Sequence, residues 1–178
     1  DSKASQLELQ DLMESQSMTR FVIDQREREE LENAWKASGV TCVVQNTGEE
    51  GNGISRLLKR LSNFTYSTDM MSEFVRKAVS PNDILQAKKE NRHALYFTGN
   101  GVPLPQDWIS VEDELRYISV FFNLGIRMMH LTYNRRNVIG DGCAETANGG
   151  LSDFGRHVVK EMNRVGVIVD IAHSGWQT

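Results

Sequence analysis

Cysteine, long hydrophobic runs and clustered basic residues are all scarce in this sequence. With only Cys42 and Cys143 among 178 residues, the chain lacks the framework of a disulfide-rich secreted protein, although the two could pair with each other. No apolar run approaches the ~20 residues that a membrane-spanning helix needs, so we expect no membrane span. The formal net charge of −4, with no basic run, argues against nucleic acid as the main partner.

The N-terminal residues also lack the features of a signal peptide. We therefore expect a soluble protein of unknown compartment, the cytoplasm or periplasm if its source is bacterial. The hydrophobic fraction of 39% is ordinary for a globular protein, and 178 residues are enough for one core. We expect a single domain over residues 1–178, with a helical extension at 1–25 and βα units over 26–178.

Hydrophobic patterning predicts helices that alternate with short apolar strands. Such alternation, with helices long enough to cross over, indicates parallel strands with outer helices, the α/β class. A (β/α)8 barrel of the TIM type typically needs about 250 residues, so the pattern predicts a partial barrel, roughly the N-terminal half. The expected strands lie near 40–44, 94–97, 126–131 and 167–172, and the expected helices near 26–36, 54–61, 67–79, 81–91, 110–122 and 152–164.

Polar segments follow several of these strands. We expect loops over 45–53, 98–101 and 134–150, and the last of these is long enough to be functional or disordered. At its exit, Gly149-Gly150 should turn the chain and Ser152 should cap the final helix, rather than bind phosphate. In parallel α/β folds, ligands bind at the carboxyl ends of the strands, which makes these loops the place to search for a site.

His173 is the strongest candidate for chemistry, because it follows an apolar strand at that end. Its imidazole suits zinc, but a histidine that is merely hydrogen bonded at a strand end would give the same pattern. Period-two alternation places Asp170 on the opposite face, where we expect it to pair with a helix or with Arg127. His130 should be packed or interfacial, and two further histidines, His93 and His157, should lie on the surface.

Two long segments, LGIRMMHLTYNRRN and GGLSDFGRHVVKEMNRVGVIVDIAHSG, and more loosely ASGVTCVVQNT, resemble the renal (membrane) dipeptidase family of zinc peptidases on an amidohydrolase-like barrel. The resemblance is clear over 110–178, weaker over 34–104 and absent over 1–25. It implies that His173 is a zinc ligand in a site with one or two zinc ions. It also implies a small peptide substrate.

The resemblance implies roles for the residues around His173, and it also shows departures. Tyr133 stands where better-known members carry a substrate-contacting histidine, and its hydroxyl could still donate to an oxyanion. Asn134 and Arg135 would bind substrate, with Arg135 pairing a peptide carboxylate. Asn100 stands where a glutamate usually bridges two zinc ions, and a neutral amide is a weaker ligand. We expect Arg136 to be a solvated loop residue.

The predicted function is therefore a zinc-dependent dipeptidase that cleaves a dipeptide or related amide by a metal-activated water. The family's Asp-x-His pair is absent from residues 1–25, and only one of the expected zinc ligands, His173, is visible. One alternative is a non-catalytic barrel homologue, and another is an inactive half-barrel fragment, either of which would bind a ligand or a partner chain. A homodimer is a further expectation.

Overall fold

The computed structural model describes residues 18–178, so the predicted extension at 1–25 lies mostly outside the described residues, although residues 18–23 are helical. The structure divides into two compact units. One comprises the residues up to Gln45 together with Leu58–Tyr96, and the other comprises Asn46–Leu57 together with Phe97–Thr178. The assignment of 1–178 to one domain stays a prediction.

Helices and strands alternate through the described chain, as the patterning predicts. The sheet has the strand order β1-β3-β4-β5, and β2 also pairs with β3. The pairs β2–β3, β3–β4 and β4–β5 are parallel, which confirms the α/β class with parallel strands. The elements are α2 (Gln25–Ser38), β1 (Cys42–Glu49), α3 (Ile54–Met70), β2 (Val75–Ala78), α4 (Pro81–Lys89), β3 (His93–Asn100), α5 (Val111–Asn123), β4 (Met128–His130), α6 (Asp153–Val165) and β5 (Ile168–Asp170).

Strand β2 was not predicted, and the helix expected over 67–79 is wrong. Helix α3 runs on through Thr68, whose hydroxyl donates to the Phe64 carbonyl at 2.6 Å instead of capping a new helix. The chain then turns at 71–74, and Val75–Ala78 pairs with His93–Tyr96. Tertiary packing outweighs local helix propensity in this segment, because the residues at both ends of β2 are buried.

Strands β1 and β3 extend into segments that we expected to be loops. Thr98 and Gly99 pair with Met128 and Met129 on β4, so residues 98–100 belong to the strand. The Thr47 hydroxyl donates to the Thr98 carbonyl at 3.1 Å, within the part of β1 expected to be loop. Polar residues therefore continue both strands, because their backbone groups find partners in neighbouring strands.

Capping residues define several helix ends. Gly39 ends α2 in the left-handed conformation, φ 69°. Ser152 accepts from the Gly155 amide and caps α6, and Gly150 precedes it at φ 81°, which confirms the expected loop exit. Ser80 and Asp83 form a capping box at the start of α4.

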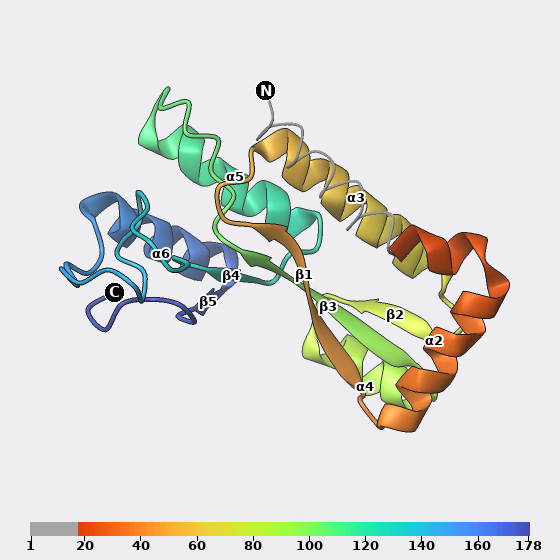
Figure 1. Ribbon diagram of the computed structural model, residues 1–178. Coiled ribbons are helices and arrows are strands. Elements are labelled where there is room, and N and C mark those ends of the chain that lie inside the picture. The colour runs from red at the N-terminus through yellow and green to blue at the C-terminus, as the bar shows by residue number, and fades with distance from the viewer. Residues whose placement is uncertain (1–17) are drawn as a thin grey trace, which may run out of the picture. The chain divides into compact units, whose positions relative to one another are not determined.

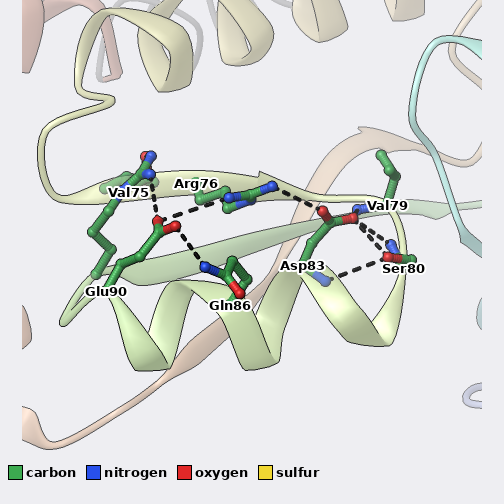
Figure 2. Close-up of polar contacts among 8 residues, drawn as sticks. Val75, Arg76, Val79, Ser80, Asp83, Gln86 and Glu90 are labelled. Carbon is green, nitrogen blue, oxygen red and sulfur yellow. Dashed lines mark hydrogen bonds and ion pairs between the residues drawn. The ribbon is translucent and has the colours of Figure 1, made fainter.

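A polar cluster joins β2 to α4 in the first unit, and Figure 2 shows its side chains. The Arg76 guanidinium lies 3.3 Å from Asp83 and 3.7 Å from Glu90. Burial alone would raise the pKa of Asp83, but hydrogen bonds from Ser80 and from two backbone amides, together with the charge of Arg76, lower it overall. The cluster thus links the first turn of α4, through Asp83, and its C-cap residue, Glu90, to the neighbouring strand β2.

The hydrophobic core follows the helix and strand faces of each unit. In the first unit, α4 packs along β2, as Figure 1 shows, over the alanines Ala78, Ala87 and Ala94. In the second unit, α5 and α6 pack against each other and α6 packs against β5 (Figure 1). Buried residues there include Ile118, Phe121, Met129, Leu131, Val158 and Met162. Across residues 18–178, no helix combines the length and apolar character needed to cross a bilayer.

Candidate metal centre at the ends of strands β4 and β5

The candidate residues gather in the second unit because β4 and β5 are in parallel register. Met128 pairs with Ile168 and His130 with Asp170, so both strands end at the same edge. Tyr133 follows β4 and His173 follows β5, and their rings stack with centroids 4.1 Å apart at an interplanar angle of 25°. The structure thus brings together residues that lie about forty positions apart in the sequence.

Asn134 fixes the orientation of the His173 ring. The ring nitrogen Nδ1 lies 3.0 Å from the amide oxygen of Asn134. Because an amide oxygen can only accept, the neutral form of His173 carries its proton on Nδ1 in this arrangement and has its lone pair on Nε2. Metal-binding histidines commonly have their second nitrogen held in this way. His173 is exposed, so the Nε2 side of the ring can be approached from solvent.

The backbone at His173 is unusual for a residue with a side chain. Its φ is +61°, in the left-handed region that favours glycine. The His173 carbonyl accepts from the Cys143 amide at 2.8 Å, which ties this turn to the loop over 134–150. Gly142 lets the loop pass close to the backbone of Tyr133 and Asn134, since a Cβ at position 142 would lie 2.3 Å from the Tyr133 carbonyl oxygen.

In the described part of the chain Asp170 pairs with His130, so the expected pairing with Arg127 or with a helix is wrong. Its Oδ2 lies 2.7 Å from Nε2 of His130, its register partner on β4. Parallel register places the two side chains on the same face, which alternation within one strand does not reveal. Arg127 instead donates to the Phe122 carbonyl and lies over the Phe122 ring, 3.8 Å from its centroid.

The other histidines are partly as expected. His130 is partly buried, with 11% of its side chain exposed, and within the described chain its Nδ1 has no hydrogen-bond partner. His157 is exposed on α6, as predicted. His93 begins β3, where its ring stacks on Trp35 with a centroid distance of 4.8 Å. The role of His130 was missed because its partner lies forty residues away in sequence.

The loop over 134–150 is ordered by a buried carboxylate. Asp141, whose side chain is 4% exposed, accepts from Nε and Nη2 of Arg136 at 2.5 and 3.1 Å and from the Gly149 amide at 2.6 Å. The hydrogen bond from Arg136, then that from Gly149, holds the pKa of the Asp141 carboxyl below its usual value. Arg136 is solvent-exposed, as expected, with 58% of its side chain accessible, and its ion pair with Asp141 also helps to order the loop. Arg135 is exposed and, among the described residues, makes no ion pair.

Asn100 ends β3, and its backbone amide donates to the side-chain oxygen of Asn46 at 3.3 Å. No hydrogen bond in the described chain joins it to His173. Both cysteines are free thiols, so the disulfide left open by the sequence is not formed. The Cys143 sulfur lies 3.4 Å from the same Asn134 oxygen that holds His173.

The described residues fit one position of a zinc site. His173 offers an oriented Nε2, but a catalytic zinc normally takes three protein ligands. Among residues 18–178, no group of three or more His, Cys, Asp or Glu side chains converges as a metal site would require. Any complete site therefore needs ligands in addition to those that the described chain brings together.

The chain matches the family model of membrane dipeptidase, peptidase family M19, over residues 6–178. The chain belongs to this family. The match confirms the resemblance and extends it further towards the N-terminus than the motifs indicated.

Individual relatives agree with the family and show how much of it the chain represents. An uncharacterized dipeptidase of Schizosaccharomyces pombe is 43% identical over 33% of this chain and 15% of its own length. An amidohydrolase from Pseudomonas aeruginosa has a TM-score of 0.72 at 30% identity, covering 84% of this chain and 44% of that one. A metallopeptidase from Rhodobacter sphaeroides, liganded with a phosphinate mimic of L-Ala-D-Ala, has a TM-score of 0.56 at 16% identity, covering 69% and 35%.

The chain thus spans less than half the length of these relatives, and its fold is that of a partial (β/α)8 barrel. The barrel class explains why the candidate residues lie where β4 and β5 end, the edge at which such barrels hold their sites.

Proposed function

We propose that the protein acts as a zinc-dependent dipeptidase, cleaving a dipeptide or a related amide. The observation that carries the proposal is His173, held through Nδ1 by Asn134 and stacked on Tyr133 at the strand-end edge of a family M19 fold. When bound, zinc polarises the scissile carbonyl and provides an activated water.

The chain's own residues have distinct roles in this proposal. His173 would hold one zinc ion through Nε2. The Tyr133 hydroxyl donates a hydrogen bond to the oxyanion that develops on the carbonyl, and it is exposed and able to meet substrate. Asn134 uses its oxygen for His173, which leaves its amide nitrogen to donate to substrate. Arg135 pairs with the substrate carboxylate in a two-pronged contact.

Asn100 bears on the number of zinc ions. A neutral amide at the end of β3 cannot bridge two cations as a carboxylate does, which favours one zinc ion or a second ion held by other groups. The same feature favours the second candidate function, a non-catalytic homologue that binds a ligand or partner chain. The predicted homodimer and the peptide substrate are both part of this proposal and await experiment.

The test is zinc content followed by hydrolysis, with the full-length protein dialysed without chelator. We expect one or two zinc ions per chain, hydrolysis of members of a dipeptide panel, and loss of activity on adding a chelator. His173→Ala should abolish hydrolysis, whereas His157→Ala, at an exposed histidine on α6, should leave it unchanged. A zinc-loaded protein that hydrolyses none of the dipeptides would reject the catalytic proposal in favour of the binding homologue.

A further inference from the structure

One carboxylate connects strand β4 to the turn that carries His173. Asp170 Oδ2 lies 2.7 Å from His130 Nε2, and its Oδ1 accepts from the Ala172 amide at 2.8 Å. The first contact crosses to the neighbouring strand, and the second reaches two residues along the chain, towards His173. Asp170 thus stabilises the start of the turn through its hydrogen bond with the Ala172 amide, and it is held in place by its contact with His130.

The turn needs such support because its backbone is strained. His173 has φ +61°, and a residue with a Cβ keeps this conformation only when its surroundings determine it. Inside the turn, the Ser174 amide donates to the Ile171 carbonyl at 3.0 Å. Ile171, Ala172 and His173 are all exposed, so packing does little to hold them. Hydrogen bonds from the buried side must therefore supply much of the constraint.

The His130–Asp170 pair lies on that buried side. The His130 side chain is 11% exposed and that of Asp170 is 18% exposed, and the His130 ring centroid lies 5.9 Å from that of His173. An apolar side chain would be less costly to bury at position 130 than an imidazole whose Nδ1 has no partner in the described chain. What the imidazole adds is a donor that reaches Asp170.

We infer that His130 is a positioning residue for His173 and acts through the Asp170 carboxylate. The inference rests on the proposed function, because it assigns the pair to the presentation of the proposed zinc ligand. Outer hydrogen-bonding partners of this kind orient the ligands that contact a metal, and losing one typically weakens metal binding by about 10- to 100-fold. His130 itself need not touch metal or substrate.

The test compares His130→Leu with His130→Gln in the full-length protein. Leucine has no donor for Asp170, whereas the glutamine amide can still donate to it. We expect His130→Leu to weaken zinc affinity by about 10- to 100-fold, measured by competition with a chromophoric chelator at fixed pH, and to shift the visible spectrum of the cobalt-substituted protein. His130→Gln should restore most of the affinity and the wild-type spectrum.

A second readout needs no metal. In the metal-free protein, nitrogen–proton correlation spectra of the histidine rings should show His173 as a single tautomer protonated at Nδ1. In His130→Leu the two tautomers should average, and in the control His157→Leu they should not. If wild-type protein binds no zinc, the proposed function fails, and the ring spectra still decide whether the pair holds His173.

Three outcomes would overturn the positioning role. His130→Leu could keep wild-type zinc affinity while lowering only the stability of the metal-free protein, which would make the pair merely structural. His130→Gln could lose as much affinity as His130→Leu. The His173 tautomer could also stay fixed in His130→Leu. If that variant does not fold, Asp170→Asn replaces it. Its amide oxygen can still accept from the Ala172 amide, but its NH2 group cannot accept from His130 Nε2. Unchanged zinc affinity in Asp170→Asn would again overturn the role.

Discussion

Glu114 should stabilise the second unit more than any other acidic residue of helix α5. It lies in the first turn with 1% of its surface exposed, and its two carboxylate oxygens accept from the amides of Gln106 and Trp108 at 2.9 and 2.8 Å. Both residues have positive φ, 61° and 54°. The carboxylate therefore holds the unusual loop that leads from β3 into α5.

The size of the effect follows from these two hydrogen bonds. A hydrogen bond to a charged group contributes about 1.5–3 kcal/mol, so Glu114→Ala removes at most about 3–6 kcal/mol. Two effects reduce this value. Gln106 and Trp108 are exposed, so water can reach the freed amides, and the variant no longer buries a charge. We expect a net loss of about 2–3 kcal/mol, and about half as much for Glu114→Gln, which keeps one acceptor.

Urea unfolding at neutral pH measures this prediction, provided that the slope of free energy against urea is unchanged. Hydrogen exchange at the Gln106 and Trp108 amides should become faster in Glu114→Ala. Glu112→Ala is the matched control, because Glu112 is exposed in the same turn and should change stability by less than about 0.5 kcal/mol. Equal stability of the two alanine variants would refute the reasoning.

Three further predictions concern other parts of the chain. Ser152→Ala should lower the free energy of unfolding by about 1 kcal/mol, measured in urea, through loss of the α6 cap; an unchanged midpoint would contradict it. The lowered pKa of Asp83 means that its contribution is present above the unfolded-state pKa of about 3.9 and is lost as the pH falls through the lower folded-state pKa. Asp83→Asn should therefore be less stable than wild type at pH 7, with the difference vanishing in acid; a difference independent of pH would count against this. With a thiol reagent at pH 8, exposed Cys143 should react rapidly and Cys42, whose pKa is raised by burial, slowly; equal rates would show the assignment of exposure to be wrong.

Much of the fold could be predicted from local patterns. The alternation of helices and apolar strands, the caps at Ser80 and Ser152 and the terminating Gly39 are encoded within a few neighbouring residues. Strand β2 could not be predicted this way, because Val75–Ala78 becomes a strand only by pairing with β3. The strand structure of the polar ends of β1 and β3 could not be predicted for the same reason, because it depends on pairing with neighbouring strands.

In the candidate site, too, the choice of residues follows from local sequence, whereas their contacts follow from the tertiary structure. The sequence by itself determined the family, the α/β class and the choice of His173, Tyr133 and Asn134 as residues of interest, because these depend on motifs whose spacing is local. Only the tertiary structure decided that Asn134 holds His173 and that Asp170 pairs with His130. Such contacts depend on which residues parallel register places side by side, and register is set by the packing of whole strands and helices.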